Sequence, residues 1–139
     1  MTLKETLAKL EEFHGHLGPY VVVGCRMGEL ALRLLGAKKY FELKIASKAG
    51  TTPPVSCMND GLQLATGCTY GKGNIKASDE GMPEAVFIQG ARSLKIALLP
   101  SMQAEMGQWL RQDGERTAAA RVYELKDEEL FEWEFMDTE

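Results

Sequence analysis

The order of periodic segments predicts an α+β fold with a mainly antiparallel sheet packed with helices. Apolar residues recur at helical spacing near the start of the chain, strand-like runs joined by short turns follow, and another strand-like run ends it. Short connections favour antiparallel pairing, because a parallel pair needs a long crossover. The 139 residues show no internal repeat, so we expect one domain spanning 1–139.

Two helices are expected at the start of the chain. Thr2 and Glu5 have the spacing of a capping box, and the helix that follows should end near Gly15. A second, amphipathic helix should run from Pro19 to Gly36, where a C-cap glycine belongs. Cys25, on the apolar face of this second helix, is expected to be buried core.

The remaining elements follow from the spacing of apolar residues and from the glycines and prolines that end each segment. Alternating residues predict a strand over 40–47, and helical spacing predicts a short helix from just after Cys57 to Gly67. Further strands are expected at 74–78, 85–90, 94–99 and 131–135, and further helices around 102–110 and over 116–126.

Charge and composition exclude several classes of protein. The formal net charge is −4, and 127–139 carries seven acids and no base, which would repel phosphate. No apolar stretch approaches the length needed to span a bilayer, and no signal peptide is recognised. Three cysteines without dense spacing suggest reduced thiols. We therefore expect a cytoplasmic protein with neither a nucleic-acid nor a membrane partner.

Three residues could form a metal site. His14 and His16 lie at the break between the first two helices, where the freedom of Gly15 would let both imidazoles converge. Cys57 lies at the start of a helix, where the macrodipole should lower its pKa. The economical site is His14, His16 and Cys57 with an open fourth position. On the residues alone, a pair of solvent-facing or core histidines is the commoner case, and Cys57 and Cys68 are better explained as small buried hydrophobic residues.

Three further residues are candidates for catalysis. Asp60 shares a helix face with Cys57 and could assist proton transfer. Cys68 and Lys72 could contact a substrate, although a helix separates Cys68 from Cys57 by more than about 10 Å. The glycine-rich turn around Lys72 fails the phosphate-loop pattern but could still cradle an anion through its amides.

Two separated motifs resemble those of the FmdE family, which takes its name from formylmethanofuran dehydrogenase. The first motif is residues 13–19 (FHGHLGP). The second consists of residues 57–60 (CMND) together with residues 66–74 (TGCTYGKGN). The resemblance extends to 127–132 and covers nearly the whole chain. It implies an α+β core, often dimeric, with zinc or nickel near the paired histidines and the cysteine. Many members have Cys at position 18, where this chain has glycine, and many carry a C-terminal zinc finger for which this sequence has no residues.

Three hypotheses remain at this point. The first is a metal-binding accessory protein of anaerobic redox metabolism, joined to a molybdenum or tungsten enzyme, in which the two histidines and Cys57 hold zinc or nickel. The second is a small hydrolytic or redox enzyme with an open metal position. The third is a structural protein whose motifs build a dimer interface.

Gly24 and Gly28 offer a surface for close approach, so we also expect a homodimer.

Overall fold

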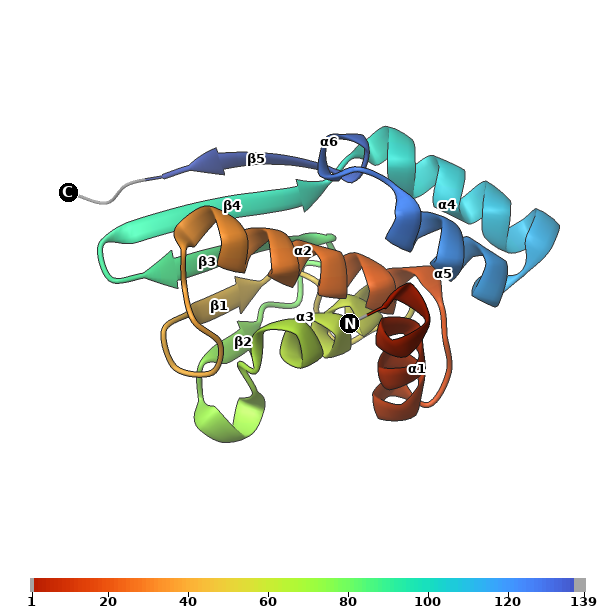
Figure 1. Cartoon of the computed structure of the whole chain (residues 1–139). Helices are drawn as coiled ribbons and strands as arrows, with labels where there is room; N and C mark the ends of the chain where they lie inside the picture. The colour runs from red at the N-terminus through yellow and green to blue at the C-terminus, as the bar shows by residue number, and fades with distance from the viewer. Residues whose placement is uncertain (1, 137–139) are drawn as a thin grey trace.

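A five-stranded sheet with helices against one face forms the framework of the computed structural model, which describes residues 2–136 (Figure 1). The strand order is β2-β1-β3-β4-β5; three pairings are antiparallel, and the β1–β2 pairing is parallel. The predicted α+β fold with a mainly antiparallel sheet is confirmed. The strands are β1 (Lys44–Ser47), β2 (Ile75–Ala77), β3 (Glu84–Gln89), β4 (Arg92–Leu98) and β5 (Phe131–Phe135).

The helices largely follow the predicted segments. Thr2 caps the first helix by accepting a hydrogen bond from the Glu5 amide at 3.1 Å, and Gly15 ends it in the left-handed region. Pro19 opens the second helix and Gly36 closes it. The principal helices are α1 (Leu3–His14), α2 (Pro19–Leu35), α3 (Met58–Thr66), α4 (Pro100–Asp113) and α5 (Glu115–Glu124). A short α6 (Asp127–Leu130), which the sequence pattern did not indicate, precedes β5.

Strand register builds one row of the core. Ile75 pairs with Ile45, Ile45 with Phe87, and Phe87 with Leu94, so four large apolar side chains cross the sheet on one face. All four are buried. Their neighbours along the strands point to the opposite face, where Lys44, Ala46 and Lys76 are exposed and Val86 and Ile88 are half-buried, as expected where helices cover only one side of a sheet.

The predicted strand over 40–47 is half wrong. Only Lys44–Ser47 forms β1, and the residues before it make a turn in which Tyr40 has a φ of 82°. A left-handed conformation interrupts the alternating direction of side chains, so the apparent strand period of 40–43 does not reflect pairing. Tyr40 and Phe41 are exposed as a result.

The backbones of α2 and α3 touch. A Cβ atom placed on Gly24 would lie 1.9 Å from the Met58 carbonyl oxygen, and one on Gly61 would lie 1.9 Å from the Val21 oxygen. Gly28 faces the Thr66 and Ala65 side chains in the same way. Gly24 and Gly28 do form a surface for close approach, but the element that packs against it is α3 of the same chain. It is therefore not available as a dimer contact, and the argument for a homodimer from these glycines is wrong.

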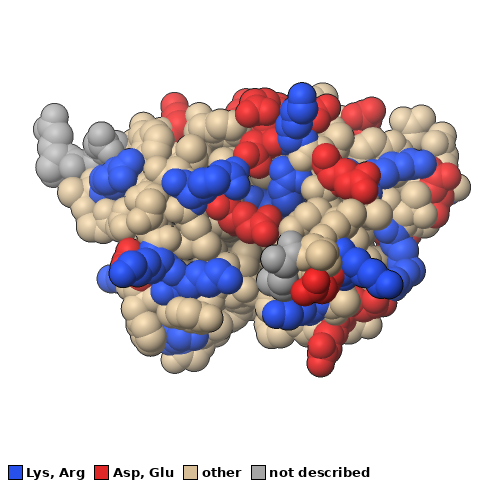
Figure 2. All heavy atoms as spheres, in the orientation of Figure 1, with Lys and Arg blue, Asp and Glu red and all other residues tan. Residues whose placement is uncertain are grey.

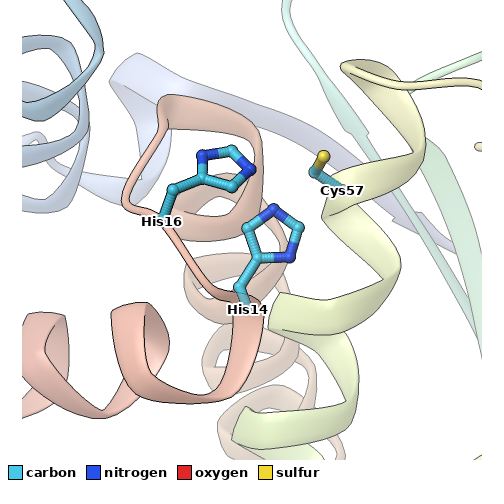
Figure 3. A group of neighbouring side chains, drawn as sticks. All are labelled: His14, His16 and Cys57. Carbon is cyan, nitrogen blue, oxygen red and sulfur yellow. The ribbon is translucent and has the colours of Figure 1, made fainter.

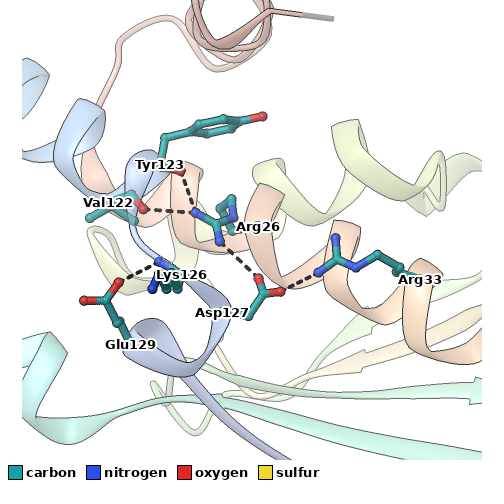
Figure 4. A network of polar contacts seen from close by, with 7 residues as sticks. All are labelled: Arg26, Arg33, Val122, Tyr123, Lys126, Asp127 and Glu129. Atoms are coloured by element: carbon teal, nitrogen blue, oxygen red, sulfur yellow. Dashed lines mark hydrogen bonds and ion pairs between the residues drawn. The ribbon is translucent and has the colours of Figure 1, made fainter.

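An arginine fixes the C-terminal half against α2 (Figure 4). Arg26 donates hydrogen bonds to the Val122 and Tyr123 carbonyl oxygens at the end of α5 and pairs with Asp127 at 3.0 Å. Arg33, further along α2, reaches the other oxygen of the same carboxylate. The last carbonyl oxygens of a helix have no hydrogen-bond partner within the helix, so a guanidinium there can donate to them. Its positive charge also interacts favourably with the negative end of the helix dipole. This contact fixes where α5 lies.

Replacing Gly24 with alanine tests the α2–α3 contact. The added methyl group would overlap backbone that cannot move independently, so the free energy of unfolding should fall by more than about 3 kcal/mol. Gly107→Ala in α4 is the matched control, since its Cβ meets nothing closer than Arg111 at 3.4 Å. That variant should be neutral or up to about 1 kcal/mol more stable in urea denaturation. Equal behaviour of the two variants would contradict the contact.

Candidate metal centre

The junction between α1 and α2 brings the two histidines together (Figure 3). His14 is the last residue of α1, and Gly15 turns the chain with a φ of 96°, which L side chains rarely adopt. His16 follows in the turn before α2, and the two ring centroids lie 4.4 Å apart. The predicted convergence of the imidazoles is present.

Cys57 approaches the histidines from another segment. It is the N-cap of α3, and its side chain points toward both imidazoles (Figure 3). One ligand atom from each of His14, His16 and Cys57 lies within 4.8 Å of the others. Since metal–nitrogen and metal–sulfur bonds are about 2.0–2.3 Å long, three atoms at this spacing can share one ion after small adjustments.

His14 is held in one orientation. Its Nδ1 lies 2.5 Å from Asp60 Oδ2, while its Nε2 is buried and has no hydrogen-bond partner within the described part of the chain. A carboxylate on Nδ1 fixes the tautomer that leaves the Nε2 lone pair free. A buried nitrogen without a partner is costly, unless a ligand occupies the space in front of it.

His16 has a carboxylate partner that the sequence did not reveal. Glu115 Oε1 lies 2.9 Å from His16 Nδ1, although 99 positions separate the two residues. Glu115 is the first residue of α5 and directly follows Gly114, so no local pattern in the sequence distinguishes it from other surface acids. Both histidines are thus bonded to carboxylates through Nδ1, which leaves both Nε2 atoms for an ion.

The predicted lowering of the Cys57 pKa is wrong for the metal-free protein. Burial raises the pKa of the Cys57 thiol, and the nearby Asp60 carboxylate raises it further. Both effects disfavour a thiolate and outweigh the helix N-terminus. A bound cation would be needed to draw the proton off the sulfur.

A cavity of about 70 Å³ lies beside the three candidate ligands. Gly18, Pro54 and Leu110 are among its walls, and Glu115 lies at its edge. A Cβ on Gly18 would come within 3.3 Å of Glu115 Oε1, so position 18 borders this space. The cavity leaves room for a small group such as water on the fourth side of an ion.

The structure does not bring Cys68 and Lys72 to this cavity. Cys68 is fully buried, and its thiol donates to the Leu43 carbonyl oxygen at 3.5 Å. Lys72 lies over the rings of Tyr40 and Phe41, 5.6 and 5.9 Å from their centroids. Of the three catalytic candidates, only Asp60 lies at the centre, where it contacts His14.

Comparison with known proteins identifies the family. The sequence profile described as "FmdE, Molybdenum formylmethanofuran dehydrogenase operon" matches residues 13–132. The chain belongs to the FmdE family. The match begins one residue before His14 and includes every residue of the candidate centre, in agreement with the resemblance found in the motifs.

Two similar proteins add context to the family assignment. A "Probable S-adenosyl-L-methionine-binding protein" of Archaeoglobus fulgidus is 34% identical over 80 residues, which is 57% of this chain and 22% of that protein. The chain thus spans well under half the length of this relative. A crystal structure of a tungsten formylmethanofuran dehydrogenase FmdE-like protein from Syntrophus aciditrophicus has a TM-score of 0.69 at 18% identity, covering 100% of this chain and 74% of that one. That likeness supports the fold.

Substitution of Asp60 tests its role in orienting His14. Asp60→Ala should weaken zinc binding about 10- to 100-fold, because the imidazole loses the partner that fixes its tautomer and direction. Glu12→Ala, an exposed acid on α1, is the control for lost negative charge. Competition with a chromophoric chelator measures both affinities. Equal affinities in the two variants would show that Asp60 does not support the site.

Proposed function

We propose that this FmdE-family chain is a metal-binding accessory protein that holds one divalent transition ion. Nε2 of His14, Nε2 of His16 and the thiolate of Cys57 are the ligands, and the fourth position is open. The described helices include none long and apolar enough to cross a membrane. We place the protein in the cytoplasm, in anaerobic one-carbon metabolism, associated with a molybdenum or tungsten enzyme of the kind named in the family description.

The observation that carries this proposal is the buried Nε2 atom of His14. It has no hydrogen-bond partner in the described chain, yet Asp60 holds the ring so that this atom faces His16 and Cys57. A purely structural histidine would satisfy both nitrogens or expose one to water. An ion that accepts the lone pair explains the arrangement.

The ligand set favours zinc or nickel. Two imidazoles and one thiolate are borderline-soft donors, and three protein ligands with one open position are typical of zinc sites that bind a further group. Calcium and magnesium prefer oxygen ligands, which none of the three residues supplies.

Removal of one imidazole tests the ligand assignment. His16→Ala should lose the ion during dialysis against a weak chelator, because two ligands hold it far less tightly than three. Cys68→Ala, which removes a thiol outside the site, should keep close to one ion per chain. Elemental analysis of protein purified without an affinity tag gives the occupancies. Full occupancy in the His16→Ala protein would refute the assignment.

Cysteine labelling tests whether the sulfur is a ligand. Cys57 is partly exposed, whereas Cys25 is 3% exposed and burial raises its pKa to about 12. In metal-free protein Cys57 should therefore alkylate first, and a bound ion should slow it sharply by occupying the attacking lone pair. Cys25 should stay inert in both states. Timed alkylation with mass spectrometry separates the two, and equally slow labelling of both would exclude Cys57 as a ligand.

A second candidate function is a small metal-dependent enzyme. The observation that favours it is the cavity of about 70 Å³ beside the ligands, with the Glu115 carboxylate at its edge. An ion held by the three ligands would supply Lewis-acid chemistry there, and Asp60 or Glu115 would accept a proton. Cys68 and Lys72 lie outside this cavity, so any substrate contact by them would have to come from a different part of the surface.

We also propose a homodimer, on the family resemblance. Gly24 and Gly28 play no part in it, because α3 covers them. Light scattering at micromolar concentration should give about twice the monomer mass of 15.4 kDa. A mass equal to one chain at that concentration would remove this proposal and leave the metal site unaffected.

A further inference from the structure

A second and larger cavity lies between α1, α2 and α3. Its volume is about 560 Å³, within the range of small-molecule sites, and it shares no lining residue with the cavity at the metal centre. Helices α2 and α3 contribute an apolar floor that includes Leu32, Leu64 and Ala65. The polar lining residues are Thr6, Lys9, Glu29, Arg33, Lys39 and Tyr40.

Tyr40, at the rim of this cavity, is strained. Its φ of 82° is rare for a bulky L residue and costs on the order of 1–3 kcal/mol. Two hydrogen bonds to its backbone hold it there: its amide donates to the Thr66 carbonyl oxygen at 2.9 Å, and its carbonyl oxygen accepts from the Asn74 side chain (Nδ2) at 2.5 Å. Strain that the surroundings maintain at the edge of a cavity points to a ligand-contacting role for the ring.

The motif over 66–74 supplies the surroundings that hold Tyr40. Asn74, besides bonding Tyr40, accepts a hydrogen bond from the Thr69 amide at 2.9 Å. Gly67 leaves space for the ring, since a Cβ there would lie 2.3 Å from Tyr40 Cδ1. Lys72 covers the ring at 5.6 Å. This motif therefore builds the Tyr40 side of the cavity and takes no part in the metal centre.

The charges around the cavity are mainly positive. Lys9 and Lys39 form no ion pair within residues 2–136, and Arg33 shares Asp127 with Arg26. Glu29 is the one acid among the described residues that line the cavity, and burial raises its pKa. Figure 2 shows lysine and arginine side chains on both sides of the hollow between α1 and the loop before β1. A net positive, partly apolar cavity favours an organic anion.

We propose that this cavity binds a planar organic anion. The flat ring packs against Tyr40 and the apolar floor, the anionic group lies between Lys9 and Lys39, and a donor such as an amino group meets Glu29. The inference goes beyond the proposed function and does not depend on a bound metal. A flat ring that carries both an anionic group and an amino group occurs in a nucleoside monophosphate and in an aromatic amino acid such as 4-aminobenzoate. The anionic group is a phosphate in the first and a carboxylate in the second, and the first is larger.

Calorimetric titration of the full chain with AMP and with 4-aminobenzoate tests the proposal. At least one should bind with a Kd below about 1 mM, while adenosine and inorganic phosphate, which each lack one half of the chemistry, should bind about tenfold more weakly or not at all. Binding of AMP alone would identify phosphate as the preferred group, and binding of 4-aminobenzoate alone would identify carboxylate. Failure of both to bind would overturn the proposal.

Variants locate the binding. Tyr40→Asn keeps a residue that tolerates the left-handed region but removes the ring, and should weaken binding about fivefold. Lys9→Met with Lys39→Met should weaken it about tenfold, whereas Lys76→Met on β2 should not change it. His16→Ala should also leave it unchanged, because the metal centre is separate. Because the lysine variants alter side chains outside the core, they remain informative if Tyr40→Asn does not fold. Undiminished binding in them would overturn the proposal.

Discussion

The contact between the α2 and α3 backbones at Gly24 and Gly61 is the constraint on which the metal centre depends. Cys57 immediately precedes Met58, whose carbonyl oxygen occupies the space where a Gly24 side chain would be. His16 lies just before α2, so the distance between the helices sets the distance between imidazole and thiol. Any side chain at the crossing would push the N-terminus of α3 away from the histidines. Two absent Cβ atoms therefore bring ligands from two segments together.

Residues that are not themselves ligands fix the orientation of the two histidines. Asp60 and Glu115 each hold a histidine through Nδ1, yet they come from different helices. Asp60 is fixed because it belongs to the helix that Cys57 caps. Glu115 depends on α5, which Arg26 holds through the carbonyl oxygens at its far end. The orientation of His16 thus depends on a guanidinium at the opposite end of α5, and the C-terminal half contributes to the centre without providing a ligand.

Much of this could be predicted from the sequence, because the relevant signals are local. Caps and periodicity located α1, α2 and α3, and the spacing of His14, His16 and Cys57 around helix ends suggested their convergence. Glu115 could not be found, because its role depends on the packing of α5. The Tyr40 turn was missed since an alternating pattern is the same whether or not the backbone pairs. The Cys57 pKa was misjudged because burial, which sequence does not reveal, outweighs the helix N-terminus.

The family motifs divide between two places in the fold, and this division bears on what the protein can do. The histidine motif and Cys57 surround a cavity of about 70 Å³, which has room for an ion and a small group. The motif over 66–74 holds Tyr40 beside the cavity of about 560 Å³. Helices α1 and α3 line both cavities or lead into both, each with different residues. Because the two cavities share no lining residue, the ion and the organic anion would occupy separate parts of the fold, and a change of ligand at one cavity would leave the walls of the other intact.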